Sequence, residues 1–227
     1  MAANAELAEQ LNKAWRFFYA RGFIDGFGHI SARGEDPDTI LVSPHSVGPN
    51  SRAQDFVLAD LSGRVREGNA PLPGELPIHL EIYKRRRDVG SVAHFHCLHA
   101  TSFSMSDVPL KPSYFMAAIF RGGIPIHPNP SFVNTSERGA ALAATLGNAR
   151  AALIRAHGVV VAAPDVVEMV GTSFLLEDNA RRTWIAASMG NVKALGEDEA
   201  EAIEAEILKN RGPFRRIWSL CEQEYDG

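Results

Sequence analysis

The chain has 227 residues, 45% of them hydrophobic and 22% charged, and a formal net charge of −4. These values are ordinary for a soluble globular protein, and the acidic balance excludes a basic surface for nucleic acid. No linker-like stretch divides the sequence, so we expect a single domain over residues 1–227 with a substantial core.

The N-terminal part of the chain predicts one helix followed by short strands. Apolar residues recur at helical spacing over residues 5–21, and Gly22 ends this pattern. The segment DGFGHISAR indicates a glycine-broken turn leading into a strand. Residues 39–43 predict a second strand, which the loop PHS at 44–46 terminates. FVLADLSGRV then predicts a hairpin, and this spacing of strands and turns indicates an antiparallel meander.

A glutamate stands at the start of the next predicted helix. Pro73 and Gly74 break the chain, Pro77 is tolerated only in a first helical turn, and apolar residues then repeat at helical spacing. Glu75 therefore lies at a helix N-terminus, where the helix dipole favours a carboxylate. A helix-terminal charge is one interpretation, and a functional group is the other.

Two histidines follow in DVGSVAHFHCLHATSFS, residues 88–104, which begins as a strand. Successive side chains of a strand point to opposite faces, so His94 and His96 project from the same face, about 7 Å apart. That separation suits two imidazoles converging on one metal ion, while Phe95 and Cys97 point into packing. Ordinary strand histidines are the alternative interpretation.

The middle of the chain combines an irregular segment with further regular elements. Residues 107–130 are rich in proline, glycine and aromatics, which in a compact domain is typical of a functional or interface segment. A helix is expected over residues 135–146, with Thr135 or Ser136 as its cap. The apolar run 151–163 predicts strands, and only Arg155 and His157 interrupt it.

Two helices and a tail complete the predicted elements. A long helix is expected over residues 165–189, where Gly190 ends it, and a second helix over residues 197–210. The tail, about residues 211–227, carries aromatic side chains that are expected to dock on a protein surface. Cys97 and Cys221 are too few for a disulfide framework, and neither a secretory signal nor a membrane span is evident, so we expect a cytoplasmic protein without a membrane partner.

Glu75, the His94/His96 pair and His157 resemble the class II aldolase/adducin family, and the resemblance covers about residues 7–189. The order of motifs carries it: a GxxSxR-like loop at 28–33, VSP at 42–44, E-x-x-x-H from Glu75, then HxH and a late RAHG. The family implies an α/β domain with three layers, α/β/α, and a mainly antiparallel central sheet. It also implies a homotetramer with active sites near subunit interfaces, where the tail would lie.

The resemblance further implies the site. One divalent metal ion per subunit would be held by His94, His96 and His157, with Glu75 as the catalytic acid/base. Three imidazoles with open positions suit catalytic Zn²⁺ best, with Mn²⁺ and Fe²⁺ as alternatives. Glu75 can donate a proton if burial raises its pKa. His79 and Arg155 are expected to be structural or to support the ligands.

The chain departs from the sugar-phosphate members of the family in three loops. Those members grip the phosphate with small polar residues and backbone amides. Histidines and a Pro-Gly pair stand at the matching positions here, which removes two hydroxyl donors and one backbone N–H. A phosphosugar is therefore disfavoured. The residues expected to bind the substrate are Gly28, His29, His45, Ser46 and Gly74, with Arg33, Arg52 or Arg121 as further candidates.

The GHISAR and SPHS pattern resembles the branch of the family that decarboxylates hydroxylated aromatic or pyridine dicarboxylates. The first interpretation is therefore a metal-dependent carbon–carbon lyase that releases CO₂ from a hydroxylated aromatic or heteroaromatic (di)carboxylate, with the metal stabilising the enolate. A class II aldolase or epimerase acting on a sugar or sugar phosphate is the second interpretation. A non-catalytic adducin-like association module is the third, and the retention of all four site residues argues against it.

Overall fold

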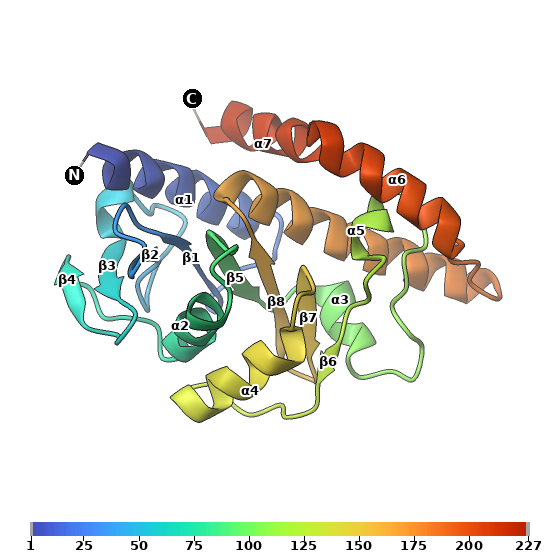
Figure 1. Ribbon diagram of the computed structural model, residues 1–227, viewed down its shortest axis with the longest axis horizontal. Coiled ribbons are helices and arrows are strands. Elements are labelled where there is room, and N and C mark those ends of the chain that lie inside the picture. The colour runs from blue at the N-terminus through green and yellow to red at the C-terminus, as the bar shows by residue number, and fades with distance from the viewer. Residues whose placement is uncertain (1, 226–227) are drawn as a thin grey trace.

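The computed structural model describes residues 2–225, and the last two residues of the predicted tail lie outside this range. A central sheet of eight strands separates two layers of helices (Figure 1). This arrangement confirms the expected α/β/α fold. The strands are β1 (His29–Arg33), β2 (Thr39–Val42), β3 (Val57–Asp60), β4 (Val65–Glu67), β5 (Ser91–Phe95), β6 (Ile126–His127), β7 (Ala151–Ile154) and β8 (Gly158–Ala163). The α-helices are α1 (Ala2–Ala20), α2 (Leu76–Arg85), α3 (Leu98–Phe103), α4 (Ser136–Leu146), α5 (Val166–Met189), α6 (Glu197–Asn210) and α7 (Gly212–Tyr225).

The strand order β4-β3-β2-β1-β5-β8-β7-β6 places β5 between β1 and β8 near the middle of the sheet. Every neighbouring pair is antiparallel except β6 and β7, which are parallel. In the β1–β5 register, His29 lies opposite His94, and His94 lies opposite Val160 of β8. The register therefore brings side chains from distant parts of the sequence to one end of the central strands.

Each face of the sheet buries its own apolar cluster. Helices α1, α5 and α7 cover one face, where Phe17, Phe95 and Phe214 are buried together. Helices α2 and α4 cover the other, where Ile78 packs with Val92. Strand alternation sends Phe95 to the first face, and so directs its neighbour His94 to the second. The α2 side of the sheet is therefore the side that carries polar chemistry.

The tail forms α7, which packs along α1 and α5 (Figure 1). Phe214 and Cys221 are its buried residues, and the Tyr225 hydroxyl donates a hydrogen bond to the Arg16 carbonyl. One face of the tail thus docks on its own chain, and its place at a subunit interface stays a prediction. No helix among the described residues has the length and apolar character needed to cross a bilayer.

Most predicted elements are present with shifted ends. The first helix begins at Ala2 instead of residue 5, and the helix after Glu75 begins at Leu76. The helix α7 was not predicted, because only docking of the tail was expected. Three short elements were also missed: α3, the two-residue strand β6, and a 3-10 helix, η2 (Phe115–Phe120), within the irregular segment. A further 3-10 turn, η1 (Ala53–Asp55), precedes β3. Single turns such as these offer too few residues for a periodic pattern.

Candidate active site

His94 is fully buried near the end of β5, and its backbone environment fixes its ring. The Nδ1–H donates a hydrogen bond to the Val159 carbonyl of β8 at 2.9 Å. The neutral imidazole then carries its lone pair on Nε2. That nitrogen faces the other predicted ligands, so the strand pairing sets both the tautomer and the direction of this side chain.

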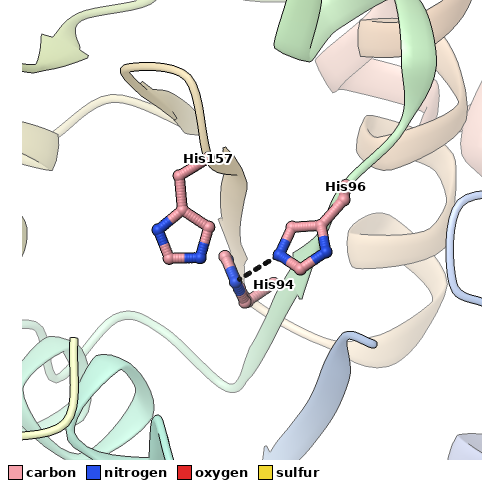
Figure 2. A group of neighbouring side chains, drawn as sticks. All are labelled: His94, His96 and His157. Carbon is pink, nitrogen blue, oxygen red and sulfur yellow. Dashed lines mark hydrogen bonds between the residues drawn. The ribbon is translucent and has the colours of Figure 1, made fainter. Parts of the chain in front are cut away.

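His96 and His157 complete a cluster around His94 (Figure 2). His96 follows the end of β5, and its Nε2 lies 3.2 Å from Nε2 of His94. His157 belongs to the turn between β7 and β8, which closes through a hydrogen bond from its N–H to the Ile154 carbonyl. Ala156 in this turn has φ 52°, a conformation uncommon for a residue other than glycine, and Ser104 Oγ accepts its N–H. This turn, whose uncommon backbone conformation is held by Ser104, therefore directs His157 toward the cluster.

Gly158 allows the cluster to form. A Cβ atom at this position would lie 2.5 Å from Cδ2 of His96 and 2.6 Å from the Phe95 carbonyl oxygen. Both distances are far below van der Waals contact, and one of the two neighbours is backbone. The glycine of the RAHG motif is thus required by the close approach of β5 and β8 beside the histidines.

Glu75 precedes α2, but its side chain makes no capping hydrogen bond to that helix. Its Oε1 accepts the backbone N–H of Val133 at 2.6 Å, and its Oε2 lies 3.6 Å from His94 Nε2 and 3.5 Å from His157 Nε2. Burial by itself would raise the pKa of Glu75. The neighbouring His157 and His94 and the N–H of Val133 outweigh burial and hold the pKa far below its usual range. The expectation of a raised pKa is wrong, and Glu75 is a carboxylate.

The donor set fits a divalent cation. The nitrogens offered by His94, His96 and His157 lie within 4.8 Å of one another. Two imidazole nitrogens bound tetrahedrally at about 2.0–2.1 Å from zinc lie about 3.3 Å apart, close to the 3.2 Å between His94 and His96. In the described part of the chain, Nδ1 of His157 is buried without a partner. Glu75 lies on the open side of this triad, near enough to coordinate an ion or to exchange a proton with a bound molecule.

The cluster opens into a cavity of about 750 Å³. The five residues predicted to bind substrate, Gly28, His29, His45, Ser46 and Gly74, all line it together with Glu75 and His96. Prediction missed two phenylalanines. Phe27 lies with its ring centroid 6.2 Å from that of His96, and Phe132 lies 6.1 Å from His157. Both side chains are 68% exposed. Each stands in a loop, where no periodicity marks it.

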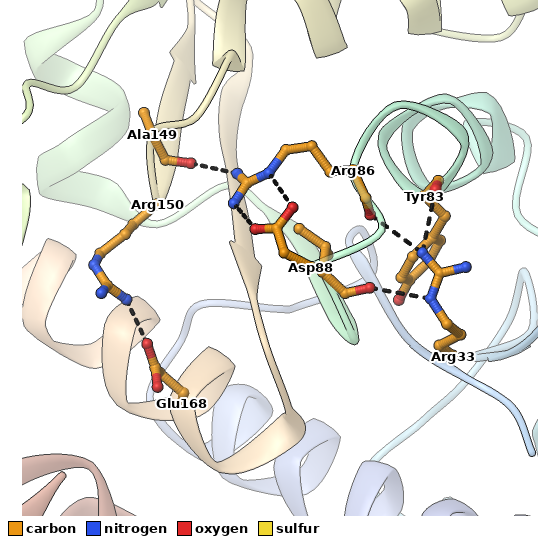
Figure 3. Close-up of polar contacts among 8 residues, drawn as sticks. Arg33, Tyr83, Arg86, Asp88, Ala149, Arg150 and Glu168 are labelled. Atoms are coloured by element: carbon orange, nitrogen blue, oxygen red, sulfur yellow. Dashed lines mark hydrogen bonds and ion pairs between the residues drawn. The ribbon is translucent and has the colours of Figure 1, made fainter. Parts of the chain in front are cut away.

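None of the three arginines predicted as further substrate-binding candidates lines this cavity. Arg33 lies over the Tyr83 ring and donates to backbone carbonyls around α2 and β5 (Figure 3). Arg52 pairs with Asp55, and Arg121 pairs with Glu204. These three predictions are wrong, because local carbonyls or carboxylates hold each guanidinium elsewhere. Among the described residues the cavity wall has neither lysine nor arginine.

Of the two supporting residues expected near the metal, one lies against the site. His79 is fully buried one turn into α2, and its Nε2 lies 2.6 Å from Nδ1 of His29. Arg155 instead is exposed, and its Nε donates to the Pro128 carbonyl at 2.8 Å. His79 therefore contacts a residue of the cavity wall, His29, whereas Arg155 hydrogen-bonds to the segment that precedes Phe132.

Comparison with known proteins identifies a matching family and similar proteins. Residues 9–184 match the Class II Aldolase and Adducin N-terminal domain family. The chain is 30% identical over 185 residues to a 3,4-dihydroxyphthalate decarboxylase of Arthrobacter keyseri, covering 74% of this chain and 73% of the relative. It is 27% identical over 193 residues to a 3,4-dihydroxyphthalate decarboxylase of Rhodococcus jostii, covering 78% and 79%. An L-fuculose 1-phosphate aldolase of Glaciozyma antarctica has a similar fold, with a TM-score of 0.86, 21% identity, and coverage of 97% of this chain and 90% of that chain.

Proposed function

The chain belongs to the class II aldolase and adducin family, and from this premise we propose that it is a metal-dependent lyase that decarboxylates a hydroxylated aromatic or heteroaromatic (di)carboxylate. His94, His96 and His157 would hold one divalent ion, with zinc as the first choice and manganese or iron as alternatives. Glu75 would move the proton. Two relatives are named as decarboxylases, which supports a lyase.

One observation carries the substrate class: the composition of the cavity wall. Two exposed phenylalanine rings, Phe27 and Phe132, flank the histidine cluster, and two further histidines, His29 and His45, line the same cavity. Aromatic rings gain from stacking against a flat aromatic substrate. A sugar phosphate would instead require a cation or a set of amides and hydroxyls around the phosphate. Among the described residues the cavity wall has neither lysine nor arginine, and Pro73-Gly74 stands where the family resemblance places two serines. Two relatives named for a dihydroxyphthalate support the same class.

The carboxylate state of Glu75 suggests how the chain handles the proton. Glu75 would accept the proton of the substrate hydroxyl that enters between it and the histidines. Glu75 then passes this proton to the ring carbon that carries the carboxylate, which turns the deprotonated oxygen into a carbonyl oxygen and restores the charge of Glu75. The bond between that carbon and the carboxylate breaks, and CO₂ leaves. The electron pair of the bond restores the aromatic ring and the negative charge on the oxygen, which takes up a proton from solvent. A divalent ion, when bound, supplies charge stabilisation for the substrate oxygens.

The Val133 amide would contribute to both proton transfers. It donates to Oε1 at 2.6 Å and thereby leaves Oε2 toward His94 and His157 for the proton. This fixed division of the two oxygens orients the carboxylate before substrate binds. The loop between β6 and α4, which contains Val133, would therefore serve the reaction through its backbone.

The test is a substrate panel on metal-loaded protein. Hydroxylated aromatic mono- and dicarboxylates, 3,4-dihydroxyphthalate among them, should release CO₂, whereas fuculose- and ribulose-type phosphates should react poorly. Aldehyde release from a sugar phosphate that outcompetes every aromatic acid would establish the aldolase instead. Protein that binds no metal and turns over neither class would favour the association module.

The proposal also covers the cellular compartment and the assembly of the protein. The free, buried Cys97 and Cys221 suit a reducing cytoplasm. Assembly as a homotetramer, with active sites near subunit interfaces, would allow a neighbouring subunit to complete the cavity, whose wall is 68% exposed at Phe27 and Phe132.

A further inference from the structure

A chain of four buried polar groups leads from the cavity into the protein. Nδ1 of His29 lies 2.6 Å from Nε2 of His79, whose Nδ1 lies 2.6 Å from Ser31 Oγ. Ser31 Oγ lies 2.9 Å from the Tyr83 hydroxyl. His79, Ser31 and Tyr83 are fully buried, and His29 is 6% exposed where it lines the cavity. Four hydrogen-bonding groups in series, with water excluded from three of them, form a connected network.

The regular elements dictate this alignment. His29 and Ser31 are two residues apart on β1, so they share the face toward α2. His79 and Tyr83 are four residues apart on α2, so they lie one turn apart on the face toward the sheet. Packing α2 against β1 therefore interleaves the two pairs. The network rests on rigid elements and does not depend on a loop.

The two imidazoles share a single hydrogen where they meet. At 2.6 Å between Nδ1 of His29 and Nε2 of His79, only one of these two nitrogens can carry a hydrogen. An imidazole keeps an N–H on at least one of its two nitrogens. If Nδ1 of His79 accepts from Ser31, Nε2 of His79 must therefore donate to His29, so the direction of a single hydrogen bond sets the direction of them all.

Tyr83 sets that direction. Burial raises the pKa of its hydroxyl, so the group keeps its proton, and the backbone of Val92 lowers this pKa in part by hydrogen bonding the same oxygen. In the described part of the chain, Ser31 Oγ is the acceptor within reach of the Tyr83 O–H. The opposite direction would bury that O–H without an acceptor, which costs the full desolvation of the group. The phenol therefore donates to Ser31, Ser31 to His79, and His79 to Nδ1 of His29.

We propose that Tyr83, Ser31 and His79 are positioning residues that fix His29 in its neutral Nε2–H tautomer, and that this N–H donates to an anionic oxygen of the substrate. The first half is a property of the protein alone, while the second rests on the proposed function. His29 selects the substrate by offering a hydrogen-bond donor in a cavity without a lysine or arginine among the described residues. The arrangement would also keep His29 from serving as a metal ligand with Glu75 and His94, because that role needs a lone pair on Nε2.

The tautomer is measured directly by ¹⁵N NMR of protein labelled at its eight histidines, with and without Zn²⁺. The His29→Gln variant assigns the His29 signals. We expect a protonated Nε2 and an unprotonated Nδ1 for His29 under both conditions. A protonated Nδ1 would overturn the proposal, whatever the enzyme turns over, so this result is independent of the proposed function.

A double-mutant cycle on 3,4-dihydroxyphthalate tests the consequence. In Tyr83→Phe the phenol that fixes the direction of the hydrogen bonds is gone, so a fraction of the molecules should carry the His29 proton on Nδ1. Those molecules lose the hydrogen bond from His29 to the charged substrate, so KM should rise about tenfold with a smaller change in kcat. The amide of His29→Gln carries a donor that no tautomer can reverse, so adding Tyr83→Phe to His29→Gln should change KM little. Equal losses in both backgrounds would show that Tyr83 is merely structural. Tyr225→Phe, whose hydroxyl bonds Arg16 between α1 and α7, is the matched control for loss of a phenol.

Discussion

At the scale of single residues, Glu75 carries the most specific expectation. Glu75→Gln keeps the shape of the side chain and its acceptor for the Val133 N–H, but it cannot accept a proton. Turnover should fall by about 100-fold or more, because a general acid/base is lost, while the metal content stays near that of the unchanged protein. Rate measurements and metal analysis on the same preparation decide this. A variant that turns over normally would make Glu75 a helix-terminal charge.

The three histidines should account for the bound metal. His94→Ala and His157→Ala should each lose most of the metal and the activity, while the fold persists, because a site with open positions is catalytic and not structural. Elemental analysis and circular dichroism provide the two readouts. His127→Ala is the matched control. His127 is also buried, but it belongs to β6 and its Nδ1 contacts the Thr145 hydroxyl instead of the histidine cluster. Full metal content in both ligand variants would contradict the assignment.

Gly158 offers a test of the geometry without removing a ligand. Gly158→Ala must displace His96 or the backbone of Phe95, so we expect weaker metal binding and a loss of about 1–3 kcal/mol in the free energy of unfolding. Gly122→Ala is the control, because a Cβ there meets no atom within 4 Å. Metal titration and urea unfolding compare the two, and indistinguishable variants would show that the cluster has room to adjust.

How much of the site is predictable from sequence depends on the range of the interaction. Strand alternation is local, so it placed His94 and His96 together correctly, and the order of family motifs added His157 and Glu75. The lowered pKa of Glu75 depends on His157, His94 and the Val133 amide, of which Val133 lies 58 residues away, and no local pattern contains these contacts. The arginines failed for the same reason, since their positive charge gave no indication of the carbonyls and carboxylates that hold them.

At the scale of elements, α4 positions the backbone next to Glu75, and its cap is open to test. The Thr135 hydroxyl accepts the N–H of Arg138, whereas sequence left Thr135 and Ser136 as alternatives. Thr135→Ala should lower the free energy of unfolding by about 1 kcal/mol. Ser136→Ala, already inside the helix, should have an effect near zero. Urea denaturation of the pair measures the difference, and equal effects would assign no capping role to Thr135.

Element prediction succeeded for most helices whose pattern repeats several times, but it left α7 as a tail without a helix although α7 spans 14 residues. The periodicity of α1, α2, α4 and α5 is visible over two or more turns, so their existence was predicted and only their ends shifted. The parallel pairing of β6 with β7 involves two residues on each strand, and such a pairing leaves no trace in alternation. The order of strands in the sheet likewise rests on contacts between segments far apart in the sequence.

At the scale of the whole molecule, a second cavity of about 370 Å³ lies between α3 and α5. Leu98, 71% exposed, and Trp184, 57% exposed, line it. Exposed apolar side chains gathered in this way are typical of a protein interface. We expect the predicted homotetramer to cover this cavity, so Trp184→Glu should lower the mass measured by light scattering. Val65→Glu on the edge strand β4, also exposed, is the control and should leave the mass unchanged.

The central register of the sheet has a consequence for the lifetime of the protein in a cell. His94 and Val159 are hydrogen-bonded across a separation of 65 residues, and the proposed ligands come from both of these segments. An ion bound there would cross-link distant parts of the chain and would favour the folded state over the unfolded one, by about 2.7 kcal/mol at a free concentration 100 times its Kd. A shortage of the metal would then do more than stop the reaction. It would increase the population of unfolded chains and expose them to proteases, so the amount of enzyme would follow the metal supply.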